Sequence, residues 1–146
     1  MKLSLLVFLL VSMLIPVMSN AQDKTPEQEL HEMISASQFV VLAYKSGGMS
    51  ALTGLSQDCY TQIRQADAFE CIYIDLGARH IDQPISKKMN WSENKYFSDE
   101  QFLPRVAPLF HSRNISMKQA NKFLRETTVY INRMVDSEII SHQESP

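Results

Sequence analysis

The sequence predicts an all-α fold: a compact bundle of about five helices with one disulfide between neighbouring helices. Apolar residues recur at helical spacing through most of residues 25–139, and the alternation typical of strands is nearly absent. The chain has two cysteines, Cys59 and Cys71, and both lie near the turn expected between two helices. A disulfide there would close a short loop, which the chain-entropy model values at roughly 3 kcal/mol.

The first 21 residues have the pattern of a cleaved signal peptide. Lys2 precedes an apolar run from Leu3 to Val17, and small residues stand before a cleavage site after Ala21. The alternative is a membrane anchor, but the run is shorter than the roughly 20 residues of a spanning helix, and Pro16 interrupts it. We therefore expect an exported chain, periplasmic or secreted, without stable membrane insertion after cleavage. In that compartment two cysteines normally pair, whereas a free reactive thiol is disfavoured.

Residues 22–146 are expected to form a single helical domain with a polar tail over 141–146. Loss of Lys2 with the leader leaves 13 basic against 16 acidic side chains, a formal net charge of −3. This charge is mild, and the basic residues are scattered rather than arranged in a stripe. Both features argue against nucleic acid as a partner.

Two helices are expected in the first third of that domain. The first begins at Pro26, with Thr25 as its N-cap, and ends at Gly47-Gly48, which permit a left-handed C-cap. Its last two turns are apolar most of the way round, which predicts a place in the middle of the bundle. The second helix runs to a break near residues 65–67. Gly54 lies inside it at a cost of about 1 kcal/mol against alanine, and we attribute it to the close approach of another helix.

The third predicted helix ends before Pro84, because proline disfavours a helical conformation of the preceding residue. Two apolar stripes predict that this helix is buried on two sides. Its polar residues Asp75, Arg79 and Asp82 are spaced so that all three can line one ridge. They form either a structural ion network or, flanked by His80, a charged patch that meets a partner protein.

The segment from Ile85 to Phe97 has no helical period and is expected to form a loop. A loop of this length with several aromatic residues either folds back over the core or forms a contact surface. Aromatic anchors beside charged residues are typical of interface hot spots. The candidate partner-binding residues are therefore Trp91, Tyr96, Phe97, Asp75, Arg79 and His80.

Two further helices are expected after this loop. The first is capped by Ser98, and Pro104 and Pro108 should kink or split it. The last is capped by Ser116 and carries a long apolar face: Ala120, Phe123, Leu124, Thr127, Ile131, Met134, Val135 and Ile139.

Patterns of catalytic, metal and cofactor sites are missing from the sequence. No two of the four histidines share a helix turn, and His31-Glu32 lacks the second histidine of the zinc-protease helix. No nucleophile elbow or glycine-rich phosphate loop occurs. Cys71 and His80 are about 13 Å apart along one helix, too far for a direct dyad. We therefore expect a protein that is not an enzyme and that has no cofactor or metal.

The stretch Phe69-Glu70-Cys71-Ile72, running into Asp75-Leu76, resembles a segment of the amidase-immunity proteins of bacterial type VI secretion. In this chain Tyr73 and Ile74 intervene between the two parts. The resemblance implies a periplasmic helical protein that binds and neutralises a peptidoglycan-degrading enzyme. We therefore expect an inhibitor or immunity protein with a protein partner. The alternative is a structural or assembly factor of the bacterial envelope.

Overall fold

The computed structural model describes residues 24–62, 68–90, 92 and 94–143. They form four α-helices and a 3₁₀ turn: α1 (Pro26–Gln62), α2 (Ala68–Met89), η2 (Lys95–Phe97), α3 (Asp99–His111) and α4 (Met117–Ser141). No strand occurs among the described residues, which confirms the all-α class. None of the helices in this part of the chain is long and apolar enough to cross a membrane. The predicted signal peptide and the predicted break at residues 65–67 lie outside the described residues.

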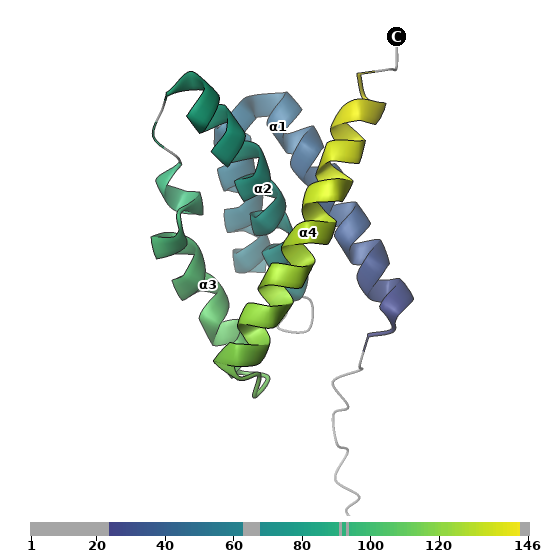
Figure 1. Ribbon diagram of the computed structural model, residues 1–146, viewed down its shortest axis with the longest axis vertical. Coiled ribbons are helices and arrows are strands. Elements are labelled where there is room, and N and C mark those ends of the chain that lie inside the picture. Colours follow the sequence, from purple (N-terminus) through teal and green to yellow (C-terminus); the bar gives the residue numbers. More distant parts are fainter. Residues whose placement is uncertain (1–23, 63–67, 91, 93, 144–146) are drawn as a thin grey trace, which may run out of the picture.

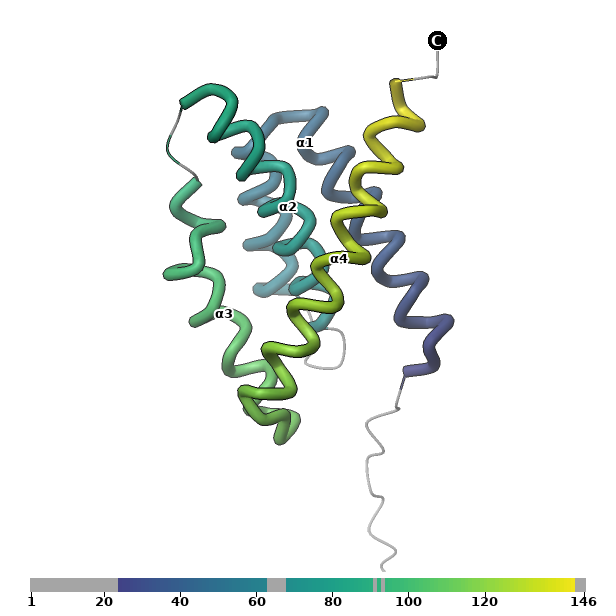
Figure 2. Tube along the Cα trace, in the orientation of Figure 1, coloured from purple at the N-terminus to yellow at the C-terminus, as the bar shows by residue number. Residues whose placement is uncertain are grey.

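The helix α1 is sharply bent at Gly47 and Gly48, whose backbone angles are not helical. Gly48 has φ 60° and ψ −147°, a conformation that residues with a side chain rarely adopt. The chain rises along the first half of α1, turns over, and descends along the second half behind α2 (Figures 1 and 2). The prediction of about five helices is therefore wrong by one, because the glycine pair bends a helix without a connecting loop.

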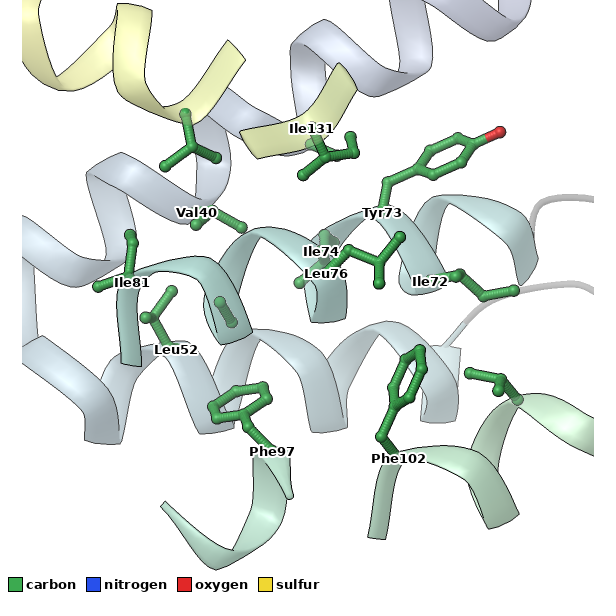
Figure 3. Close-up of a cluster of buried hydrophobic side chains, with 14 of the residues drawn as sticks. Val40, Leu52, Ile72, Tyr73, Ile74, Leu76, Ile81, Phe97, Phe102 and Ile131 are labelled. Atoms are coloured by element: carbon green, nitrogen blue, oxygen red, sulfur yellow. The ribbon is translucent and has the colours of Figure 1, made fainter. Parts of the chain in front are cut away.

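The centre of the bundle is α2, in which every residue from Cys71 to Ala78 is buried. Its core side chains point in several directions, toward α1, toward α4 and toward the η2–α3 segment (Figure 3). The predicted burial on two sides is confirmed, and it extends around most of this helix. The neighbouring elements add Val40, Leu52, Phe97, Phe102 and Ile131, among others, to this core.

One glycine lets the helices approach α2 closely, and it is Gly77. A Cβ atom there would lie 3.2 Å from Cγ2 of Val40 and 3.3 Å from Cγ2 of Val135, so α1 and α4 both pack against this position. The close approach that we predicted at Gly54 is wrong, since a Cβ atom there would meet nothing within 4 Å. Gly54 therefore has no packing reason among the described residues.

Helices continue through the prolines that were expected to end or split them. The helix α2 runs past Pro84 to Met89, so the predicted loop is wrong for its first part. The hydroxyl of Ser86 donates to Oδ1 of Asp82 at 3.2 Å across this turn, and both residues are buried. Burial and this side-chain bond compensate for the backbone bond that proline cannot donate. Likewise α3 is not split, although it contains Pro104 and Pro108.

The disulfide between Cys59 and Cys71 is formed, with 5.6 Å between the two Cα atoms. It joins the end of α1 to the start of α2, as predicted. Two of the predicted N-caps are also present: Gln28 N donates to Oγ1 of Thr25, and Gln119 N donates to Oγ of Ser116 at the start of α4. At the start of α3 the hydroxyl of Ser98 donates to the Lys95 carbonyl instead of capping the helix.

The contrast between the two helical glycines predicts opposite effects of alanine. Gly77→Ala should lower the free energy of unfolding by about 1–3 kcal/mol, because the valines of α1 and α4 must move apart. The matched control, Gly54→Ala, should raise it by up to about 1 kcal/mol, because alanine favours the helix and has open space. Urea unfolding of both variants measures the difference, and equal stabilities would contradict the close packing at Gly77.

Candidate functional site

A buried carboxylate, that of Asp75 in the middle of α2, joins three elements of the bundle. Arg105 of α3 contacts its Oδ2 through Nη2 at 3.0 Å and Nε at 3.2 Å. The hydroxyls of Ser56 and Tyr60, both in the second half of α1, donate to the same carboxylate. Asp75 is fully buried, so these groups replace the water that an ionised carboxylate needs.

The same arginine holds the segment before α3 in place. Nη1 of Arg105 donates to the carbonyl of Tyr96 at 2.8 Å and to that of Gln101 at 3.0 Å. Its guanidinium lies over the Tyr96 ring, 3.9 Å from the ring centroid. The Tyr96 hydroxyl is in turn hydrogen-bonded to Oγ of Ser56 at 2.9 Å. We call Ser56, Tyr60, Asp75, Tyr96 and Arg105 the polar centre.

Burial raises the pKa of the Asp75 carboxyl above its ordinary value, because the charged form loses its hydration. The bonds from Ser56, Arg105 and Tyr60 oppose this shift by stabilising the carboxylate. Burial and the adjacent carboxylate also raise the pKa of Tyr60, which keeps its phenol protonated as a donor. The guanidinium of Arg105 is the one cation in this balance, so the carboxylate depends on it.

The ridge predicted along α2 is not a single ion network, because its members face different neighbours. Arg79 donates from Nη1 to the carbonyl of Phe97 at 2.7 Å and forms an ion pair with Asp99. Asp82 accepts a hydrogen bond from the backbone of the segment before η2. Asp75, as described above, pairs with Arg105. Each residue of the ridge therefore has a structural partner, but the three do not share one.

An open cleft of about 320 Å³ lies between α2, α3 and α4. This volume is at the small end of the range for ligand pockets in proteins, roughly 300–1,000 Å³. The apolar lining side chains are Leu76, Phe102, Leu103 and Leu124. The polar lining side chains are Arg79, His80, Gln83, Asp99, Asn121, Arg125, Thr128 and Asn132.

The polar groups of the cleft differ in whether they already have partners. Nε2 of His80 lies 2.7 Å from Oδ1 of Asp136, and Arg79 is paired with Asp99. In contrast, Arg125 makes no hydrogen bond or ion pair with another described residue. Oδ1 of Asn132 is buried without a hydrogen-bond donor in the described part of the chain. Among the described residues that line the cleft, Arg125 is therefore the guanidinium that can meet a ligand, whereas the Asn132 oxygen is out of a ligand's reach.

The six predicted partner-binding residues fall into separate places. Arg79 and His80 line the cleft together. Trp91 lies outside the described residues. The other three are held inside the molecule or within the polar centre: Asp75, Tyr96 and Phe97. The sequence left open whether this segment covers the core or forms a contact surface. At Tyr96 and Phe97 it folds back over the core.

Sequence reasoning missed the α4 side of the cleft and the role of Arg105. Asn121, Arg125, Thr128 and Asn132 follow one another at helical spacing, so they form a polar stripe beside the apolar face. That stripe is a signal in the sequence, and it could have been found. Arg105 offers no such signal, because a charged residue beside the apolar face of a short helix is normally solvated.

The first half of α1 is more exposed than its composition predicts. We expected its last two turns in the middle of the bundle, yet the side chains of Phe39 and Leu42 are 51% and 50% exposed. Leu30 and Ile34 are also exposed. The expectation was wrong because α2, rather than this half of α1, occupies the centre.

Comparison of the chain with protein-family models, with curated proteins and with solved structures finds no match. Within the described residues, no group of three histidine, cysteine or acidic side chains is placed to hold a metal ion. The function therefore has to be argued from the cleft and from the scaffold that holds it.

The polar centre predicts a pH-dependent effect of losing Arg105. Arg105→Met should lower the free energy of unfolding by about 3–5 kcal/mol at neutral pH, because the Asp75 carboxylate is left buried and unpaired. Without the guanidinium, the pKa of folded Asp75 rises further above the ordinary value of 3.8. The variant therefore loses stability as the pH rises from the pKa of Asp75 in the unfolded chain to its pKa in the folded chain. The difference in stability between wild type and variant should accordingly become smaller toward acid pH.

Denaturant unfolding of the wild type and the variant between pH 4 and pH 8 measures this deficit. The matched control is Arg133→Met on the exposed face of α4, which should change stability by less than about 0.5 kcal/mol. Adding Asp75→Asn to Arg105→Met should remove the extra pH dependence. A deficit that is the same at every pH would show that Asp75 does not depend on Arg105.

Proposed function

We propose that this chain is an exported binding protein, an inhibitor or immunity protein that neutralises a cell-wall-acting enzyme in the periplasm. The observation that carries the proposal is the cleft between α2, α3 and α4. It combines an apolar lining from all three helices with amide and guanidinium groups from α2 and α4. A concave surface of this kind suits the recognition of a segment that projects from a partner.

The polar groups of the cleft favour recognition over catalysis. Among the described residues that line the cleft, Thr128 alone has a hydroxyl, and it donates to the Leu124 carbonyl at 2.6 Å within its own helix. His80 faces Asp136 rather than a hydroxyl or a thiol, so the pair has no nucleophile to activate. Asp75 does not line the cleft with Arg79 and His80, so these three side chains do not form a catalytic set there. We therefore propose a protein without enzymatic activity.

The scaffold around the cleft is fixed before any partner binds. The Cys59–Cys71 bond ties α1 to α2, and Arg105 ties α3 to α2 through Asp75. A preformed surface loses less conformational entropy on binding, which favours tight inhibition by a small protein.

Three features point to the periplasm and to this class of target. The leader is typical of export, and a disulfide is stable in an oxidising compartment. Enzymes that degrade the cell wall act in the same compartment. The likeness around Cys71 and Ile72 to amidase-immunity proteins supports a peptidoglycan amidase as the target.

Periplasmic co-expression tests this function. The genes adjacent to the one encoding this chain supply the candidate enzymes, each directed to the periplasm of a bacterial host. The chain should restore growth to cells that one of these enzymes otherwise lyses. Purified chain should also stop digestion of peptidoglycan sacculi by that enzyme at a near-stoichiometric ratio, as expected of a tight interface.

The matched control is the chain without its first 21 residues, which should stay in the cytoplasm and fail to protect. Lysis that continues in the presence of the exported chain, with no inhibition of any neighbouring hydrolase in vitro, would overturn the proposal. Stable capture of an envelope complex without any effect on hydrolysis would instead support the assembly factor.

A further inference from the structure

Two ridges of side chains meet where α1 crosses α4. Nε2 of Gln38 donates to Oε1 of Glu138 at 3.4 Å, which marks the crossing. Leu30 and Ile34 precede Gln38 at four-residue steps, so they continue the α1 ridge. Tyr130 likewise continues the α4 ridge, two such steps before Glu138. Both helices run upward in the view, and below the crossing they diverge (Figures 1 and 2).

The diverging ridges leave large apolar side chains open to solvent. Leu30, Ile34 and Tyr130 are 46%, 39% and 55% exposed. None of the three lines the cleft between α2, α3 and α4. Exposed apolar side chains that gather on one surface mark a place where another molecule packs. This surface is therefore a second interaction site, separate from the cleft.

Two charges of opposite sign flank these apolar side chains. Glu27 lies three residues before Leu30 on α1, and Arg133 lies three residues after Tyr130 on α4. Both charged side chains are exposed, and neither has a hydrogen bond or an ion pair with another described residue. We call Glu27, Leu30, Ile34, Tyr130 and Arg133 the crossing patch. Because it carries both signs, the patch is complementary in charge to itself.

The positions of the charges select a second copy of this chain as the occupant. Leu30 and Tyr130 both lie eight residues before the crossing, so they are level with each other at about 12 Å from it. Since α1 and α4 run in the same direction here, Glu27 is about 4.5 Å to one side of that level and Arg133 about 4.5 Å to the other. Reversing α1 about a two-fold axis at that level brings its Glu27 beside Arg133.

We infer that two copies of the chain associate through their crossing patches about such an axis. Leu30 of each copy packs against Leu30 and Tyr130 of the other, and each Glu27 pairs with Arg133 of the other. Within one chain these two charges are offset by about 9 Å along the helix direction and stand on separate helices, so they pair between copies. The contact leaves the cleft open, and the inference does not depend on the proposed function.

The concentration dependence of the molecular mass tests this association. The protein is the disulfide-bonded chain purified from the periplasm, measured by sedimentation velocity from about 1 to 200 µM, because a small interface gives weak association. The mass should rise from that of a monomer toward that of a dimer. Association should weaken between about 0.05 and 0.5 M salt, since salt screens the two exposed ion pairs.

Charge reversal identifies the surface. Glu27→Arg and Arg133→Glu should each weaken association at least about tenfold, because two repulsive pairs replace two attractive ones. The matched control is Glu100→Arg, which reverses an exposed acidic residue in the first turn of α3, outside the patch, and should preserve the dimer. A circular-dichroism spectrum of each variant shows that it is folded.

A mixture of the two charge variants gives the sharpest result. In a heterodimer of Glu27→Arg with Arg133→Glu, both contacts again join opposite charges. The mixture should therefore associate about as tightly as the wild-type chain, although each variant alone stays monomeric. Restoration in the mixture cannot come from a change in the stability of either variant.

The other outcomes overturn the inference. A monomer at every concentration would show that another partner covers the crossing patch. A dimer that survives both charge reversals would place the contact elsewhere on the molecule, and a mixture that stays monomeric would exclude the pairing of Glu27 with Arg133. Oligomers that grow beyond two copies would show an open contact in place of a two-fold one.

Discussion

The contact between Asp75 and Arg105 is the interaction on which the rest of the structure depends. A fully buried carboxylate is tolerated only with a cation and hydrogen-bond donors around it. Arg105 supplies the cation from α3, and Ser56 and Tyr60 supply hydroxyls from α1. The hydrogen bonds and the ion pair around Asp75 thus hold the second half of α1, the η2 segment and α3 against α2. Arg79 adds a second attachment, since it holds the Phe97 carbonyl and Asp99 at the start of α3.

Much of the fold follows from local patterns in the sequence, whereas its centre does not. Helical periodicity, the capping residues Thr25 and Ser116 and the cysteine pair predict the helices and their covalent link. Local rules fail where tertiary contacts outweigh them. At Pro84 the helix continues, and Ser86, two residues further along the chain, is buried. They also do not distinguish Gly54 in open space from Gly77 between two valines, because periodicity carries no information about distance.

The site was harder to predict than the fold for the same reason. Aromatic residues in a segment without periodicity suggest an interface, yet Tyr96 and Phe97 are taken up by the polar centre and the core. Arg79 and His80 do line the cleft, but as residues of α2 that face α3 and α4. The packing of the helices determines whether a polar stripe, such as that of Asn121 and Arg125, is exposed to solvent or lines a cleft. Spacing along one helix cannot supply that information.

Native-state hydrogen exchange tests most directly whether α3 is a fixed wall of the cleft. If Arg105 and Arg79 fasten it to α2, the amides of Val106 and Phe110 should exchange through the same opening, with the same free energy, as those of Ile72 and Leu76. A helix held only by its three buried apolar residues would open by itself. A free energy of opening below about 1 kcal/mol for the α3 amides, while the α2 amides stay protected, would contradict a preformed cleft.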